Sequence, residues 1–133
     1  MNMNPNQLYK STGFSWKKRG QSIGFALQGM LLFFKKEHNA RLHGLATILV
    51  LLLSVYFRVN VYEAIALTLS IGMVWAAEIF NTSIERIMDY LSKEKHPAIK
   101  IIKDLAAAAV LVTALTALLV GAFVFIPKII AVW

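Results

Sequence analysis

Most of the side chains that could do chemistry are concentrated in one segment, residues 76–92, with the sequence AAEIFNTSIERIMDYLS. If this segment is a helix with about 100° per residue, its polar side chains form one stripe about 100° wide, and apolar side chains cover the rest. The stripe consists of Glu78, Asn81, Thr82, Glu85, Asp89 and Ser92. A helix that only leaves a bilayer does not need several carboxylates on one face, so the stripe predicts a functional site.

Glu78 follows an apolar run and lies roughly one helical turn inside the expected membrane boundary. A carboxylate at that depth costs several kcal/mol unless it faces protein, an ion or water. Glu78 is therefore a candidate general base or acid. A structural interpretation stays open for Glu78 and Asp89, in which each carboxylate pairs with a lysine or arginine across a helix bundle.

Other charged residues could bind a metal ion or phosphate. Glu37 and Glu85 lie beside basic residues, and Mg²⁺ prefers one or two carboxylates together with phosphate oxygens. Glu37 could instead balance the two lysines before it. Lys103 and Asp104 could bind a nucleotide, or they could be a lysine that reaches the interface and its counter-ion. Because the sequence has neither GxxxxGK[ST] nor GxGxxG, phosphate binding would depend on carboxylate-bound metal and lysines.

The composition is that of a membrane protein. Of the 133 residues, 58% are hydrophobic and 16% are charged, whereas soluble domains have about 45–50% apolar and about 25% charged residues. The net charge of +7 suits lysines and arginines beside anionic lipid better than it suits nucleic-acid binding. The absence of cysteine excludes a disulfide scaffold, a thiolate metal site and a cysteine nucleophile.

The hydropathy pattern predicts an all-α integral membrane protein with three transmembrane helices and an N-terminal amphipathic surface helix. We expect a basic tail over residues 1–20 and a single membrane domain over residues 21–133. An ordinary buried helix fits the proposed surface segment equally well. The expected elements are the surface helix at about 21–36 and spans at about 38–58, 62–91 and 98–126.

The positive charges predict the orientation of the spans. Seven of the 14 lysines and arginines precede the first span, and five lie between the second and third. Because positively charged segments stay in the cytoplasm, the N-terminus should be inside and the C-terminus outside.

The pattern E-x-x-N-T-x-I-E-x-x-x-D, from Glu78 to Asp89, resembles the prokaryotic diacylglycerol kinase family, which includes the undecaprenol kinases of Gram-positive bacteria. An earlier E-x-N-x-R-x-H string and later H-P and K-D-x-A-A-A-A-V elements match at the expected spacing. The resemblance covers roughly residues 20–127. The matching residues are Glu37, Asn39, Arg41 and His43 before the pattern, and His96-Pro97 and Lys103–Val110 after it.

The resemblance implies a small homotrimeric lipid kinase in the bacterial cytoplasmic (inner) membrane, with active sites shared between neighbouring subunits. Such enzymes transfer the γ-phosphoryl group of ATP, with Mg²⁺, to the hydroxyl of a membrane lipid, here undecaprenol or diacylglycerol. The expected partners are therefore ATP, a lipid alcohol and further copies of the chain, and no nucleic acid.

By the same resemblance, Glu78 would be the base that takes the proton from the lipid alcohol, and Glu37 and Glu85 would hold the metal. The ATP-binding residues would be Lys18, Phe25, Glu37, Glu85, Glu94, Lys95, His96, Lys103 and Asp104. The supporting or substrate-side residues would be Asn81, Asp89, Asn39, Arg41 and Ala107.

Two positions depart from some relatives. Phe25 replaces a tyrosine, and Ala107 stands where Gram-negative diacylglycerol kinases have a serine. Together with the E-x-N-x-R-x-H string, Ala107 favours the undecaprenol-kinase branch.

Two other functions fit parts of the sequence less completely than a kinase does. A small proton-coupled transporter would use Glu78 as proton carrier, but it gives no role to the charged residues outside the membrane. A non-catalytic membrane assembly subunit leaves the carboxylate stripe unexplained.

Overall fold

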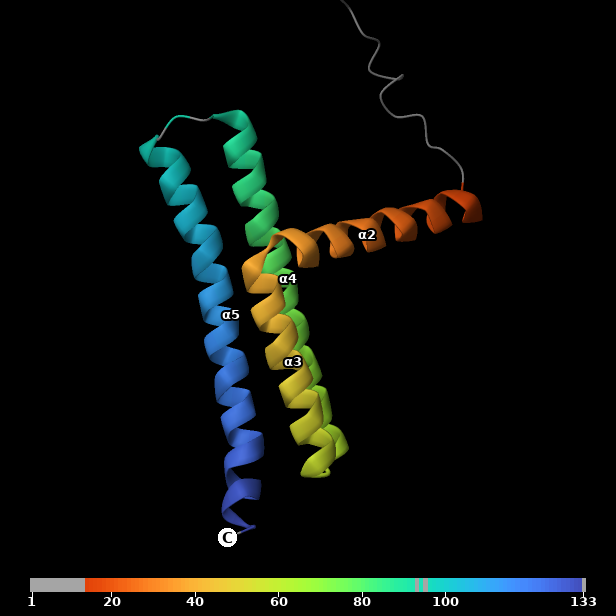
Figure 1. The fold of residues 1–133 in the computed structure, drawn as a ribbon, viewed down its shortest axis with the longest axis vertical. Helices are drawn as coiled ribbons and strands as arrows, with labels where there is room; N and C mark the ends of the chain where they lie inside the picture. Colours follow the sequence, from red (N-terminus) through yellow and green to blue (C-terminus); the bar gives the residue numbers. More distant parts are fainter. Residues whose placement is uncertain (1–13, 93, 95, 133) are drawn as a thin grey trace, which may run out of the picture. The chain divides into compact units, whose positions relative to one another are not determined.

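The computed structural model describes residues 14–92, 94 and 96–132. These residues form four α-helices and no strand (Figure 1). Their bounds are Trp16–Lys36 for α2, His38–Tyr56 for α3, Val61–Leu91 for α4 and Pro97–Ile130 for α5. The prediction of an all-α fold with three membrane spans is confirmed, because α3, α4 and α5 are each long and apolar enough to cross a bilayer.

Helix α2 belongs to a unit of its own, over Met1–Lys35, and the three long helices belong to a second unit, Lys36–Trp133. α2 begins at Trp16, five residues before the predicted start of the surface helix. The basic residues that follow Trp16 are good helix formers and extend the helix toward the N-terminus. Of the predicted basic tail, residues 1–13 lie outside the described residues.

In the second unit, α4 contacts both α3 and α5, and its packing against α5 is much the more extensive (Figure 1). Leu67 of α4 packs with Val124 and Phe125 of α5 in a small core. Most other large apolar side chains are exposed in the single chain. Since water would penalise that surface, lipid or further protein must cover it.

The link between α3 and α4 is a tight turn. The amide of Arg58 donates to the carbonyl of Val55, and the amide of Val59 donates to the carbonyl of Ser54. Arg58 has φ 48°, so these bonds form the left-handed C-terminal motif that usually contains glycine. The turn ends α3 at Tyr56, two residues before the predicted end of the first span.

Asn60 and Glu63 start α4 with a reciprocal capping box. The Asn60 side chain accepts a hydrogen bond from the Glu63 amide at 3.0 Å, and the Glu63 carboxylate accepts one from the Asn60 amide at 2.7 Å. Glu63 also pairs with Lys128 of α5 at 3.0 Å. This ion pair lies near the end of α5, which continues through Pro127 to Ile130 and so extends beyond the predicted limit at residue 126.

At the other end of the unit, His96 and Pro97 begin α5. The His96 ring nitrogen Nδ1 accepts a hydrogen bond from the Ala98 amide at 3.2 Å. Pro97 occupies the first helical turn, where its missing amide hydrogen costs nothing. The predicted break between the second and third spans therefore lies where α5 begins.

Loss of the capping side chain at Asn60 should destabilise the second unit. We expect Asn60→Ala to lower the free energy of unfolding by about 1 kcal/mol, because it leaves helix amides without an acceptor. Unfolding by sodium dodecyl sulfate in detergent micelles measures this change. Asn60→Ser keeps a capping oxygen and serves as the matched control, so equal losses in both variants would contradict the assignment.

Candidate functional site

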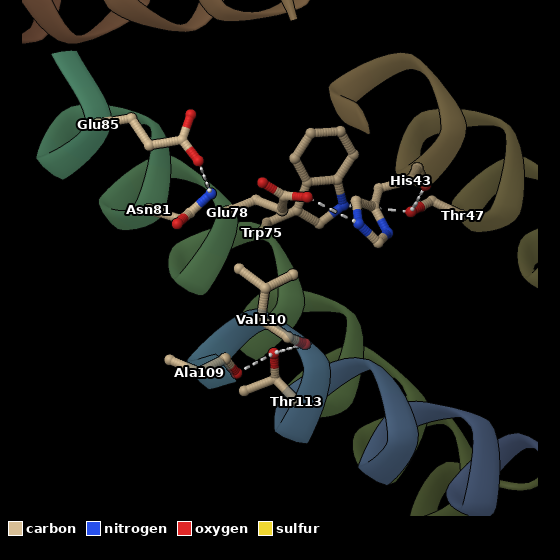
Figure 2. A network of polar contacts seen from close by, with 9 residues as sticks. All are labelled: His43, Thr47, Trp75, Glu78, Asn81, Glu85, Ala109, Val110 and Thr113. Atoms are coloured by element: carbon tan, nitrogen blue, oxygen red, sulfur yellow. Dashed lines mark hydrogen bonds and ion pairs between the residues drawn. The ribbon is translucent and has the colours of Figure 1, made fainter. Parts of the chain in front are cut away.

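Glu78 is buried within the apolar unit and contacts a histidine. Its side chain is only 3% exposed, and its Oε1 lies 3.2 Å from Nε2 of His43 on α3 (Figure 2). The structural interpretation of Glu78 expected a lysine or an arginine as its partner. The structure instead provides an imidazole, which can hold or donate a proton near neutral pH.

A second polar contact lies beside the first and joins the same two helices. The indole Nε1 of Trp75 on α4 donates to the Thr47 hydroxyl on α3 at 3.1 Å, and this hydroxyl donates to the His43 carbonyl at 2.7 Å (Figure 2). The two contacts join positions 43 and 47 to positions 78 and 75, as expected for antiparallel helices in register. They fix how α3 presents His43 to Glu78.

Asn81 and Glu85 continue the polar stripe one and two turns beyond Glu78, as the helical spacing predicted. The Asn81 amide nitrogen donates to Oε1 of Glu85 at 3.1 Å (Figure 2). Asn81 is 7% exposed, and its Oδ1 has no hydrogen-bond partner among the described residues. Because buried oxygens normally accept a hydrogen bond, this oxygen is suited to a ligand, an ion or water.

Glu37 is brought to α4 by an ion pair. Its Oε1 lies 2.7 Å from the Arg86 guanidinium, so its partner is Arg86 rather than the two lysines before it. Arg86 follows Glu85 directly in the sequence. Across residues 14–92, 94 and 96–132, no group of three or more histidine, aspartate or glutamate side chains is placed to hold a metal ion.

Four of the predicted ATP-binding residues, together with the predicted supporting residue Asp89, line one cavity, where α4 ends and α5 begins. The cavity has a volume of about 740 Å³, which is in the range of small-molecule sites. Lys103 of α5 forms an ion pair with Asp89 of α4, and Lys100 pairs with Asp104 within α5. The lining residues are Asp89, Ser92, Glu94, His96, Pro97, Ile99, Lys100, Lys103 and Asp104.

A second cavity is apolar and lies among the three long helices. It has a volume of about 400 Å³, and most of its lining side chains are apolar, such as Leu67 and Phe125. His43, Thr47 and Trp75 also line it. The apolar cavity therefore borders His43, which contacts Glu78, and also Thr47 and Trp75, which form the second polar contact.

The other predicted site residues have no part in the hydrogen bonds and ion pairs described above. Asn39 and Arg41 are exposed near the start of α3, and Ala107 is exposed on α5. Lys18 and Phe25 lie on α2, in the first unit. Lys95 lies outside the described residues.

Sequence reasoning did not assign a role to His43, Thr47, Trp75 or Lys100. The sequence did contain a sign that His43 is functional. It is the one ionisable residue in the apolar run from Leu42 to Val55. Trp75 and Lys100 had no comparable signal.

Comparison with known proteins shows the family to which the chain is similar. The family model described as prokaryotic diacylglycerol kinase matches residues 24–125. An undecaprenol kinase of Bacillus subtilis is 33% identical over 109 residues, which are 82% of this chain and 89% of that protein. A diacylglycerol kinase of Escherichia coli K12 is 26% identical over 113 residues, 85% of this chain and 84% of that protein.

A diacylglycerol kinase of Synechocystis is 28% identical over 111 residues, 83% of this chain and 63% of that protein. The family match covers all of α3 and α4 and most of α5, including Glu78 and His43. The predicted resemblance is thus confirmed, and the chain belongs to the prokaryotic diacylglycerol kinase family.

Proposed function

We propose that this protein is a lipid kinase that transfers the γ-phosphoryl group of ATP to the hydroxyl of a membrane lipid, with undecaprenol preferred over diacylglycerol. The observation that carries the proposal is Glu78, a carboxylate buried in a membrane span and hydrogen-bonded to His43 beside an apolar cavity. The higher identity to an undecaprenol kinase than to the diacylglycerol kinases supports this preference.

The apolar cavity supports a lipid acceptor. Its lining favours a hydrocarbon chain, whereas His43, Thr47 and Trp75 provide polar groups for a hydroxyl. A lipid alcohol whose chain occupies this cavity would have its hydroxyl close to Glu78.

The cavity at the start of α5 supports a nucleotide. Lys100, Lys103 and His96 offer donors for phosphate oxygens, and Asp89 and Asp104 offer acceptors for ribose or base. The lysines and aspartates of this cavity pair with one another. We propose that the active sites are shared in a homotrimer, which would also cover the exposed apolar surface.

The residues around Glu85 fit a magnesium ion with oxygen ligands. Glu37 and Glu85 would hold Mg²⁺, and the unpartnered Oδ1 of Asn81 lies beside the Glu85 contact. Two carboxylates completed by phosphate oxygens are a usual environment for this ion. When bound, Mg²⁺ would neutralise charge on the transferring phosphoryl group. Arg86 would have to share the Glu37 carboxylate with the ion.

In the proposed reaction, Glu78 accepts the proton of the lipid hydroxyl as the lipid oxygen forms its bond to the γ-phosphorus. The bond between that phosphorus and the β–γ bridging oxygen breaks, and ADP leaves with the electron pair. Proton transfer of this kind contributes about 10²–10⁴-fold to a rate. The rest of the acceleration comes from holding both substrates in line.

The transporter hypothesis is not favoured by these observations. It requires Glu78 alone, so the charged residues of the cavity at the start of α5 have no role in it. Membership in a kinase family argues against it as well.

Removal of the carboxylate should abolish transfer. We expect Glu78→Gln to lower kcat by at least about 10²-fold while nucleotide binding and folding are kept. The measurement is ATP-dependent phosphorylation of undecaprenol and of diacylglycerol, presented separately in detergent–lipid micelles. Glu63→Gln on the same helix is the matched control and should stay active; wild-type turnover in Glu78→Gln would exclude the base role.

Variants at adjacent positions should change the magnesium requirement in opposite directions. Glu85→Ala removes a ligand and should raise the Mg²⁺ concentration for half-maximal activity. Arg86→Gln removes a competitor for Glu37 and should lower that concentration by up to about fivefold, because exposed ion pairs are worth about 1 kcal/mol or less. Magnesium titrations of activity measure both, and unchanged curves would show that these residues are structural.

The orientation of the spans can be measured because the chain has no cysteine of its own. We propose that α2 lies along the cytoplasmic surface and that α5 ends outside. A membrane-impermeant maleimide should label Ala131→Cys in intact cells and label Ser22→Cys only after lysis. Labelling in the opposite order would reverse the proposed topology.

A further inference from the structure

We propose that His43 is the positioning residue of the buried base: its Nε2–H donates to Oε1 of Glu78 and directs Oε2 of Glu78 toward the acceptor hydroxyl. This inference rests on the proposed function, because it takes Glu78 as the group that receives the lipid proton. Nothing in the sequence pattern alone gives His43 this task, since the two residues are 35 positions apart.

The geometry supports a donor role for the ring. The contact of 3.2 Å joins Nε2 to one carboxylate oxygen only, and within the described chain Oε1 is the Glu78 oxygen that has a hydrogen-bond partner (Figure 2). An ionised carboxylate only accepts, so the hydrogen must lie on Nε2 when Glu78 is charged. The same contact stabilises the charged carboxylate in an environment with little water.

Other ionisable groups near this contact are few. On α3, Arg41 is exposed two residues before His43, and on α4 the next carboxylate is Glu85, two turns away and bonded to Asn81. Helix α5 has no ionisable side chain from residue 105 to residue 126. Among the described residues, His43 is therefore the ionisable side chain that contacts Glu78.

Among the described residues, no side chain of α5 donates a hydrogen bond to Glu78. The Thr113 hydroxyl of α5 bonds to the carbonyls of Ala109 and Val110 at 3.1 Å and 2.9 Å (Figure 2). Each hydroxyl has one hydrogen to donate, so Thr113 is satisfied within its own helix.

The position of the ring is fixed by its own helix and by α4. Thr47 lies one turn further along α3. Its hydroxyl donates a hydrogen bond to the His43 carbonyl and accepts one from the Trp75 indole. These contacts leave the His43 side chain 25% exposed while Glu78 is almost fully covered. The ring therefore lies between the apolar cavity and the carboxylate, where it can orient the carboxylate without replacing it.

The residue type needed at position 43 follows from this geometry. Glutamine carries an amide nitrogen at about the same distance from the backbone as Nε2, whereas the amide of asparagine reaches only to about the place of Nδ1. We expect His43→Gln to keep at least about a third of the wild-type kcat. His43→Asn should lose about 10- to 100-fold in kcat, because a hydrogen bond to a charged group is lost. The KM for ATP should not change in either variant.

Lipid phosphorylation by the full chain in micelles tests this split, with His38→Asn as the matched control for loss of a histidine on α3. Equal losses in the glutamine and asparagine variants, full activity in His43→Asn, or a change in KM for ATP with kcat kept would each overturn the proposal. Absence of any lipid phosphorylation by the wild type would instead be a failure of the kinase assignment.

A second measurement does not depend on turnover. The chain has three histidines, so ¹⁵N NMR of histidine-labelled protein in micelles should give resolvable ring signals, and His43→Gln identifies those of His43. Glu78→Gln should shift the Nε2 signal of His43 and leave those of the other two histidines in place. Identical His43 signals in the wild type and Glu78→Gln would overturn the contact itself.

Discussion

A carboxylate inside an apolar helix unit must obtain its hydrogen bonds from the fold, and the contact between Glu78 and His43 supplies one. The contact also joins α3 to α4, two helices that pack less extensively than α4 and α5 do. From Glu78 the polar stripe continues along α4 through Asn81 and Glu85 to the cavity at the start of α5. One helix thereby connects a buried carboxylate with a cavity open to water, which is the arrangement that the proposed reaction between a membrane alcohol and a soluble nucleotide would require.

The helices could be predicted from the sequence because hydropathy and helical spacing are local properties. Their ends could be predicted less well, since these depend on contacts between distant residues. α5 continues to Ile130 and carries near its end the contact of Lys128 with Glu63, 65 positions earlier. The end of α3 at Tyr56 depends on Arg58, whose backbone has the left-handed conformation. The sequence did not predict this conformation, because the turn has no glycine.

The site was predictable to the extent that it lies on one helix. The hydrogen bond between Asn81 and Glu85 follows from their separation of four residues. The partners of Glu78 and Glu37 lie 35 and 49 positions away, so spacing alone could not identify His43 or Arg86. The family resemblance indicated which carboxylates to expect in the site, but it did not indicate which side chain each of them contacts.

The two ion pairs between α4 and α5 lie near opposite ends of these helices, Glu63 with Lys128 and Asp89 with Lys103. These ion pairs and the extensive packing between them oppose sliding of α5 along α4, although each exposed pair contributes only about 1 kcal/mol or less. Among the described residues α3 has no ion pair to α5; it meets α4 through the polar contacts of His43 and Thr47 and through Val50 and Leu53, which pack against the core around Leu67. Under the proposed function, a small shear of α3 would admit the hydrocarbon chain of the acceptor to the apolar cavity, and it would couple that entry to the hydrogen bond between His43 and Glu78.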